Sequence, residues 1–309
     1  MAVDMKGKDV ISIHDLSVEE VEQILKTAEM IKLMAKSGQP YRPLAGKTLG
    51  MIFQKPSTRT RVSFEVAAWQ LGGYALYLSA SDLQLKRGET IADTARVLSR
   101  YVDGIMIRTF DHNEVVELAA HATVPVINGL TDLLHPCQIL ADLFTIREKK
   151  GDLSRLRLAY IGDGNNVTHS LYFGAAKVGM DMIAITPEGY EPDAEILKLA
   201  REDAAATGAS LELSHDPADV AGADVVYTDV WASMGQEDEH EERVRRMQPY
   251  QVNADLMARA KPDAIFMHCL PAHRGEEVTD EVADSRQSVI FDQAENRLHV
   301  QKAILALVM

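Results

Sequence analysis

The chain has 309 residues, of which 46% are hydrophobic and 25% are charged, the usual balance of a folded globular protein. Its 32 Lys and Arg residues are outnumbered by 46 Asp and Glu residues, and the net charge of −14 disfavours nucleic acid and anionic membranes as partners. Two cysteines, no signal-like N-terminus and no long apolar run argue against a disulfide-framework or membrane-spanning protein, so we expect a cytoplasmic enzyme.

Short β-branched runs alternate with amphipathic stretches along the chain. In the first half, this pattern predicts strands over 48–53, 74–78, 104–108 and 124–127, and helices over 57–71, 91–101, 113–121 and 135–150. In the second half, it predicts strands over 157–162, 181–186, 210–213, 224–228, 264–268 and 288–291, and helices over 168–178, 193–206, 252–260 and 293–308.

Alternation at this spacing indicates βαβ units, which build parallel sheets. Because ten strands exceed what one small sheet needs, we predict an α/β protein with two doubly wound domains, each a mostly parallel sheet flanked by helices. A polar break at 147–152 predicts domains over 1–147 and 148–291, with the C-terminal helix 292–309 packing back on the first. Ligands of such sheets bind beyond the carboxyl ends of the strands, so the residues that follow strands are the candidates.

The segment over 53–64 begins at the end of the first predicted strand. It contains hydroxyl and cationic side chains but no Asp or Glu. Ser57 can cap the next helix, whose N-terminal N–H groups and partial positive charge suit an anion. The guanidinium of Arg59 fits phosphate oxygens in a bidentate manner. A capped surface helix with solvated basic residues is the alternative, but the place directly after a strand favours a phosphate site. The hydroxyls are those of Ser57, Thr58 and Thr60, and the cations are those of Lys55, Arg59 and Arg61.

Three later motifs accompany this segment: His135-Pro-Cys-Gln138, Asp229-Val-Trp-Ala-Ser-Met-Gly235 and His268-Cys-Leu-Pro271. With Ser57-Thr-Arg-Thr60 they resemble, in order and over nearly the whole chain, the signatures of the aspartate/ornithine carbamoyltransferase family. The resemblance implies transfer of the carbamoyl group of carbamoyl phosphate to the δ-amine of L-ornithine, giving citrulline and phosphate in arginine metabolism. It implies no cofactor and no metal, and an active site in the cleft between a carbamoyl-phosphate-binding domain (1–147) and an ornithine-binding domain (148–291).

The resemblance also implies which residues bind carbamoyl phosphate. Arg108 would bridge the phosphate and the carbamoyl oxygen, while His135 and Gln138 would hold the carbamoyl group from one face of a helix. Taken alone, a strand-end Arg is usually a structural ion pair, and a His and a Gln three residues apart are usually a helix cap with a polar contact. The implied set is Ser57, Thr58, Arg59, Thr60, Gln84, Arg108, His135, Gln138, Cys269, Leu270 and Arg297, with catalytic roles for Arg108, His135 and Cys269.

The implied ornithine-binding residues are Asn166, Asp229, Ser233 and Met234. A carboxylate at Asp229 suits an ammonium group, and the Ser233-Met234 turn can receive a carboxylate. Cys269 would lie beside the side-chain amine, although a lone cysteine is more commonly an inert buried thiol. Whether Cys269 accepts the proton or only positions the amine is left open.

The loop over 81–90 is too polar for a core and could be an ordinary exposed loop. The resemblance implies instead that Gln84 in this loop reaches carbamoyl phosphate in a neighbouring subunit, in a homotrimer or a multiple of trimers. Lys86 and Thr90 stand where close relatives often carry Gly and Pro, which leaves the contacts of this loop open.

Other acceptors fit the residues less well than free ornithine. Putrescine lacks the α-carboxylate that Ser233 and Met234 can receive, and it is the nearest alternative. Aspartate would need cations where the chain offers Asp229 and Trp231. An acylated ornithine would lose the charge that Asp229 can pair with.

Three other classes of protein are alternatives to a transferase. Gly162 and Gly164 after a strand suggest a dinucleotide site, but Val167 occupies the place of the third glycine. A zinc hydrolase could use His268, Cys269 and His273, but neighbouring residues of a strand point to opposite faces. If the chain were a non-catalytic anion-binding protein, the presence of so many polar residues at strand ends would be a coincidence.

Overall fold

The computed structural model describes residues 3–81, 83, 88–232 and 240–309. The chain forms two compact units, one comprising Met1–Phe144 and Glu295–Met309 and the other Thr145–Ala294. The division falls inside the helices α5 (Pro136–Lys150) and α11 (Ile290–Val308), so each of these helices contributes residues to both units.

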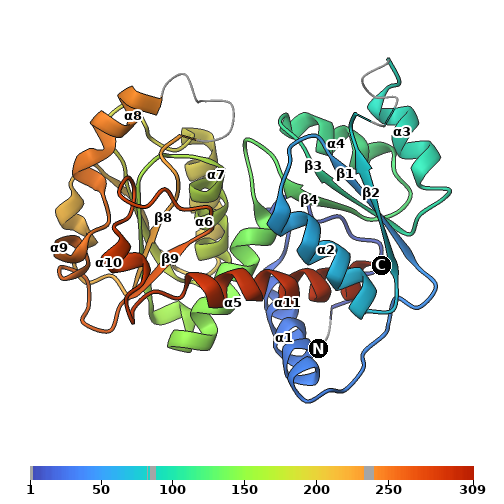
Figure 1. Cartoon of the computed structure of the whole chain (residues 1–309), viewed down its shortest axis with the longest axis horizontal. Helices are drawn as coiled ribbons and strands as arrows, with labels where there is room; N and C mark the ends of the chain where they lie inside the picture. Colours follow the sequence, from blue (N-terminus) through green and yellow to red (C-terminus); the bar gives the residue numbers. More distant parts are fainter. Residues whose placement is uncertain (1–2, 82, 84–87, 233–239) are drawn as a thin grey trace. The chain divides into compact units, whose positions relative to one another are not determined.

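The first unit contains a four-stranded parallel sheet in the order β2-β1-β3-β4 (Figure 1). Apart from Thr48, the two central strands are buried throughout, as expected for a parallel sheet covered on both faces. The side chains of Ile52, Ile105 and Val115 belong to one hydrophobic core cluster of this unit. The strands are β1 (Thr48–Phe53), β2 (Tyr74–Ser79), β3 (Gly104–Arg108) and β4 (Val126–Leu130), and the helices are α1 (Val18–Lys36), α2 (Thr58–Gln70), α3 (Ile91–Leu98) and α4 (His112–His121).

The second unit contains a five-stranded parallel sheet in the order β7-β6-β5-β8-β9 (Figure 1). Ile161, Val226 and Phe266 bring its central and edge strands into one core cluster with residues of α9 and α10. The strands are β5 (Arg157–Ile161), β6 (Asp181–Ile185), β7 (Leu211–Ser214), β8 (Val225–Thr228) and β9 (Ile265–His268), and the helices are α6 (Asn166–Val178), α7 (Ala194–Ala204), α8 (His240–Met247), α9 (Ala254–Met257) and α10 (Asp280–Ala283).

The predicted fold class, two α/β domains that each hold a parallel sheet flanked by helices, is confirmed. The strand predicted over 288–291 was wrong, because Ser288 forms only an isolated bridge with Phe266 and α11 begins at Ile290. A short apolar run cannot be assigned to a strand or a helix by its pattern alone. The predicted helix over 252–260 is reduced to the four residues of α9.

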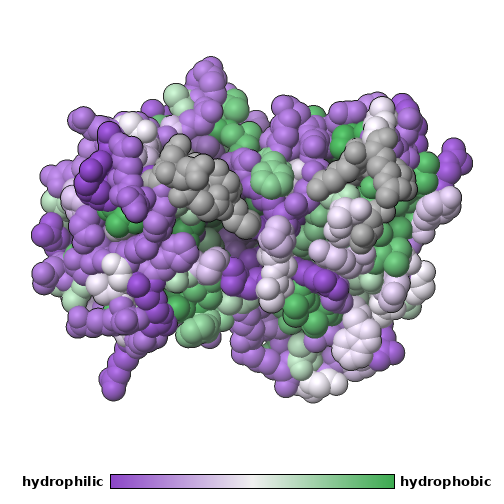
Figure 2. All heavy atoms as spheres, turned by 45° about the horizontal axis from the view of Figure 1, so that its top comes forward, coloured by the Kyte–Doolittle hydropathy of each residue, from purple (hydrophilic) through white to green (hydrophobic). Residues whose placement is uncertain are grey.

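The surface carries both charged and apolar side chains. Figure 2 shows hydrophilic residues over most of the face that it draws, with apolar residues in separate patches. In the first unit the aromatic side chains of Trp69, Tyr74 and Tyr101 are 74%, 64% and 76% exposed. Across the described ranges, no helix is both long enough and apolar enough to cross a membrane.

Gln301 on α11 is a buried polar side chain of the first unit. It is 0% exposed, and among the described residues neither its Oε1 nor its Nε2 has a hydrogen-bond partner. An unsatisfied buried amide costs about 1–3 kcal/mol, so we expect Gln301→Met to raise the free energy of unfolding by at least about 1 kcal/mol. Urea unfolding followed by circular dichroism measures this difference.

Gln293 is the matched control for this prediction. Its amide is also 0% exposed, but it accepts the N–H of His268 at 3.0 Å and donates to the hydroxyl of Tyr227 at 3.1 Å. Gln293→Met should therefore lower the free energy of unfolding by about 1–3 kcal/mol. Destabilisation of equal size by both substitutions would contradict the idea that the Gln301 amide is unsatisfied.

Candidate active site

The strand order places candidate residues at one point of each sheet. In the first unit the order reverses between β1 and β3, and Phe53 at the end of β1 pairs with Arg108 at the end of β3. In the second unit it reverses between β5 and β8, where Ile161 pairs with Thr228. Ligands of open α/β sheets bind at the carboxyl ends of the strands at such reversals. Each unit therefore has one candidate site, which we call the first-unit site and the second-unit site.

The N-terminus of α2 forms one wall of the first-unit site. Ser57 is the N-cap residue, and its hydroxyl accepts the N–H of Thr60 at 3.2 Å. Thr58 opens the helix and is exposed, while Thr60 is fully buried and its hydroxyl accepts a hydrogen bond from Nη2 of Arg297 at 2.7 Å. No acidic residue lies in this first turn. The helix end thus offers hydroxyls, N–H groups and a partial positive charge to an anion.

The pKa of His135, which lies directly before α5, is affected by the positive charges of the first-unit site. The His135 side chain is 4% exposed, and its pKa lies well below the ordinary value because of burial first, and then because of the guanidinium groups of Arg297, Arg108 and Arg59. The imidazole is therefore neutral near pH 7, with one donor and one acceptor nitrogen. Three guanidinium groups that act on one buried ring indicate a place that a bound anion would stabilise.

Gln138 lies one turn into α5 and is 1% exposed. Its Nε2 donates to Oδ1 of Asp142 at 2.8 Å, which fixes the orientation of the amide. Its Oε1 is buried and has no hydrogen-bond partner in the described part of the chain. A buried carbonyl oxygen of this kind is an acceptor for a ligand N–H group.

The three cations of the 55–61 segment do not form one group. Lys55 pairs with Asp132, and Arg61 pairs with Glu65 one turn further along α2. Of the three, Arg59 is the one that contributes to the first-unit site, and its buried Nε has no hydrogen-bond partner within the described residues. The expected cluster of three cations is therefore reduced to one, because each of the other two has a carboxylate partner.

The lowered pKa of His135 has a consequence for stability. The unfolded chain takes up this proton near pH 6.5, whereas the folded chain does so only at lower pH. Between these two values the unfolded state binds more protons, so the free energy of unfolding should fall as the pH drops below about 6.5, by up to about 1.4 kcal/mol per pH unit. Above that pH the contribution is fully present. Urea unfolding at a series of pH values measures the slope.

The substitution His135→Gln measures how much of the pH dependence of the free energy of unfolding is due to His135. The pKa values of His112 and His299 are also lowered by burial, so His135→Gln should flatten the acid-side slope without removing it. A slope that is the same in His135→Gln and in the unsubstituted chain would contradict the lowered pKa.

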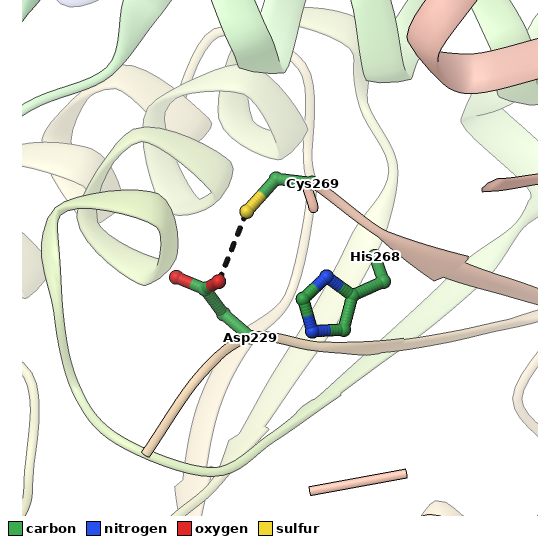
Figure 3. Close-up of side chains that lie close together, drawn as sticks. All are labelled: Asp229, His268 and Cys269. Carbon is green, nitrogen blue, oxygen red and sulfur yellow. Dashed lines mark hydrogen bonds between the residues drawn. The ribbon is translucent and has the colours of Figure 1, made fainter. Parts of the chain in front are cut away.

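Asp229 is the centre of the second-unit site. It follows β8 and is 5% exposed, and Oδ1 accepts the thiol of Cys269 at 3.0 Å while Oδ2 accepts Nδ2 of Asn165 at 2.8 Å (Figure 3). Both contacts are with neutral groups. A carboxylate has about four lone-pair sites, so this one can still accept from an ammonium group.

Asn165, a neighbour of the predicted ornithine-binding residue Asn166, donates to Asp229. Asn165 is the N-cap of α6, and its Oδ1 accepts the N–H groups of Val167 and Thr168. This orientation turns Nδ2 toward Asp229. Sequence analysis missed Asn165, although a strand followed by Gly-Asp-Gly-Asn is a recognisable capping signal. Asn166 is the first residue of α6.

The expectation that His268 and Cys269 point to opposite faces of a strand was wrong. β9 ends at His268, so the alternation does not extend to Cys269, and ligand atoms of Asp229, His268 and Cys269 lie within 4.8 Å of one another (Figure 3). Nδ1 of His268 accepts the N–H of Leu270 at 2.8 Å, so Nε2 carries the proton that it donates to Glu277 at 3.0 Å. Both ring nitrogens are thus engaged, and the ring positions Leu270, whose φ is +60°.

Arg243 holds two loops of the second-unit site. It is 8% exposed, and its Nη1 lies 3.1 Å from Oδ2 of Asp163 and 3.1 Å from the carbonyl oxygen of Trp231. Asp163 precedes the Asn165 cap, and Trp231 follows Asp229 by two residues. This guanidinium therefore fixes the two loops that present the groups around the carboxylate.

Three predicted binding residues, Gln84, Ser233 and Met234, lie outside the described residues, as does Lys86. The others divide between the units. The first-unit site brings together Ser57, Thr58, Arg59, Thr60, Arg108, His135, Gln138 and Arg297. The second-unit site brings together Asp229, Cys269 and Leu270, and Asn166 lies in the same unit at the start of α6.

Known proteins match both units. Residues 8–148 match the family described as aspartate/ornithine carbamoyltransferase, carbamoyl-P binding domain, and residues 154–308 match aspartate/ornithine carbamoyltransferase, Asp/Orn binding domain. The ornithine carbamoyltransferase of Thermococcus kodakarensis is 64% identical, with 100% of this chain and 98% of the relative covered. The anabolic ornithine carbamoyltransferase of Pyrococcus furiosus is 63% identical over the same shares.

Solved structures agree with these matches. The ornithine carbamoyltransferase from Pyrococcus furiosus has a TM-score of 0.97 at 63% identity, covering 99% of this chain and 98% of that one. The enzyme from Gloeobacter violaceus has a TM-score of 0.88 at 48% identity, covering 98% and 99%. On its sequence, its two folds and its strand-end residues, the chain belongs to the aspartate/ornithine carbamoyltransferase family.

Proposed function

We propose that this chain transfers the carbamoyl group of carbamoyl phosphate to the δ-amine of L-ornithine, forming L-citrulline and phosphate. The observation that carries the proposal is the concentration of three guanidinium groups around the buried, neutral His135, together with the N-terminus of α2, which is capped by Ser57 and has no acidic residue in its first turn. Full-length relatives at 62–64% identity that are named ornithine carbamoyltransferases support ornithine as the acceptor.

The first-unit site would bind the donor. The phosphate oxygens would lie at the N-terminus of α2, held by Ser57, Thr58, Arg59 and Thr60, with Arg297 orienting the Thr60 hydroxyl. The carbamoyl NH₂ group would donate to the unfilled Oε1 of Gln138 and to the carbonyl oxygen of Leu270. Arg108 and His135 would donate to the carbamoyl oxygen.

The second-unit site would bind the acceptor. Asp229 would accept the α-ammonium group, and Asn166 would contact the amino acid end, while Ser233 and Met234 would receive the α-carboxylate. The Cys269 thiol donates to Asp229, so its sulfur lone pairs face away from that bond and can accept a hydrogen bond from the δ-amine. We infer that Cys269 positions the amine, and that Asp229 holds the thiol of Cys269 in place while it binds the α-ammonium group.

The reaction needs no covalent enzyme intermediate. The lone pair of the neutral δ-amine forms a bond to the carbonyl carbon, and the oxygen becomes negatively charged. The bond from carbon to the phosphate oxygen then breaks, and the nitrogen loses a proton to an oxygen of the departing phosphate. Donors from Arg108 and His135 would stabilise the oxyanion, and Arg59 would stabilise the leaving phosphate. Because only the unprotonated amine attacks, activity should rise toward alkaline pH.

The assay that tests this function measures carbamoylated product from carbamoyl phosphate with ornithine, putrescine, aspartate or N-acetylornithine, from neutral to alkaline pH. Strong preference for ornithine is the expected result. Preference for putrescine would keep the donor site and remove the assigned role of Ser233 and Met234. Absence of turnover with every amine would overturn the proposal.

We also propose a cytoplasmic homotrimer, or a multiple of trimers, in which Gln84 of one subunit completes the donor site of its neighbour. The exposed Trp69, Tyr74 and Tyr101 support an association surface on the first unit, and the two free cysteines suit a reducing compartment. Mixing an inactive Gln84→Ala variant with an inactive Arg59→Ala variant should restore part of the activity, because some sites would then receive both intact residues. No recovery in mixed oligomers would contradict a shared site.

A further inference from the structure

A second cluster of metal-ligating side chains lies in the second unit, apart from the proposed carbamoyl-phosphate-binding and ornithine-binding residues. It consists of His273, Glu276 and Glu277 in the turn after Leu270, joined by His240, which lies at the start of α8 beside Glu276, and we call it the His–Glu cluster. Nε2 of His240 lies 3.3 Å from Oε1 of Glu276, and Nδ1 of His273 lies 3.6 Å from its Oε2. One ligand atom each from His273, Glu276 and Glu277 lies within 4.8 Å of the other two.

These separations suit a small tetrahedral ion. Nitrogen and oxygen ligands about 2.0–2.2 Å from Zn²⁺ lie roughly 3.3–3.6 Å from one another in a tetrahedron. The two His–Glu separations already have this length. The side chains of His240 and His273 are 39% and 45% exposed, so small rotations of either ring can close the cluster further.

The buried carboxylate of Glu277 points independently to a cation. Glu277 is 0% exposed, and its Oε1 accepts from Nε2 of His268 at 3.0 Å and from the N–H of His273 at 2.6 Å. Its Oε2, and also Oε2 of Glu276, are buried and have no hydrogen-bond partner among the residues that the structure describes. Buried carboxylate oxygens without a donor are costly, and a metal ion would satisfy both.

The charges and the ligand atoms of these side chains indicate which metal ion would bind. Two carboxylates and two neutral imidazoles around a divalent cation give a neutral complex. Imidazole nitrogens favour Zn²⁺ and its transition-metal neighbours over Mg²⁺ or Ca²⁺, which prefer oxygen alone. We propose that the His–Glu cluster binds one Zn²⁺ ion per chain through His240, His273, Glu276 and Glu277, a site separate from the proposed carbamoyl transfer.

The bound ion would link α8 to the turn that follows the Cys269 segment. His240 is supplied by α8, and the other three ligands by residues 273–277. Glu277 also holds His268, so the ion would stabilise the carboxylate on which that ring depends. An ion that binds the folded chain and not the unfolded chain raises the apparent stability, so Zn²⁺ should raise the Tm of the second unit.

Binding is measured on the metal-free full chain carrying Cys269→Ser, because Asp229, His268 and Cys269 form another group of possible ligands. Isothermal titration with Zn²⁺ should give one ion per chain. His240→Ala and His273→Ala should each weaken binding by more than about 10-fold. His215→Ala is the matched control, since His215 pairs with Glu191 at 3.8 Å at the surface, and it should leave the affinity unchanged.

Co²⁺ gives a second readout in the chain with Cys269 intact. A site of nitrogen and oxygen ligands shows visible d–d bands without a thiolate-to-cobalt charge-transfer band. That spectrum, lost in His240→Ala, is the expected result. Binding that survives both histidine substitutions, a charge-transfer band lost in Cys269→Ser, or no binding at all would overturn the proposal. Equal Tm values of the metal-free variants show that the substitutions leave the fold intact.

Discussion

Replacing Arg59 with methionine should lower kcat/KM for carbamoyl phosphate about 10²–10³-fold, the usual cost of removing one preorganised donor from a site where charge develops. Arg59 lies in the first turn of α2, is half-buried, and is one of three guanidinium groups that lower the pKa of His135. The substitution keeps much of the volume of the side chain and removes the charge and the bidentate donors. Steady-state kinetics with each substrate varied in turn measures the change.

Two further variants distinguish the loss of the Arg59 charge from non-specific damage to the protein. Arg59→Lys keeps a positive charge without the planar fork, so its activity should fall between that of Arg59→Met and that of the unsubstituted enzyme. Arg96→Met removes an exposed guanidinium paired with Asp93, and should leave kcat/KM unchanged. NMR titration should also show a higher pKa for His135 in Arg59→Met, because one of the cations that lower it is gone. Full activity of Arg59→Met would remove Arg59 from the donor site.

Much of the fold follows from local patterns in the sequence. β1 and β3 begin and end where their apolar runs predict, because a parallel strand buried on both faces must be apolar throughout. α1 was missed, although Ser17 and Glu20 form a capping box that can be read in the sequence. The strand predicted over 288–291 is wrong because Ile290 and Phe291 form the start of α11, where Ile290 is buried and Phe291 is exposed.

The site could be predicted where it depends on chain-local geometry and not where it depends on long-range contacts. Ser57 follows a strand and caps a helix, and both properties can be read from neighbouring residues. The hydrogen bond between Arg297 and Thr60 joins residues 237 positions apart, so no spacing rule finds it, and only the family resemblance implied a role for Arg297. The contact of Asn165 with Asp229 requires the packing of two strand ends side by side, which the pattern of one strand does not contain.

Asp229→Asn should raise KM for ornithine and lower kcat/KM for ornithine by about 10–100-fold, with KM for carbamoyl phosphate changed little. The carboxylate is 5% exposed and accepts from two neutral donors, so its negative charge is available to an ammonium group. Asparagine has nearly the same shape, but its amide cannot pair with an ammonium group, and its NH₂ group would face a donor of the site. A hydrogen bond to a charged group is worth about 1.5–3 kcal/mol, which corresponds to the expected loss.

The division of effects between the two substrates is the decisive feature of this prediction, because Arg59 and Asp229 belong to different units of the chain. Arg59→Met should act mainly on the donor, and Asp229→Asn mainly on the acceptor. Cys269→Ser keeps both a donor to Asp229 and an acceptor for the amine, so its loss of activity should be smaller than that of Asp229→Asn. Asp255→Asn, an exposed residue of α9, is the control for the change of net charge. If Asp229→Asn raised KM for carbamoyl phosphate as strongly as KM for ornithine, Asp229 would be a structural residue of the whole site and its assignment to the ornithine ammonium group would fail.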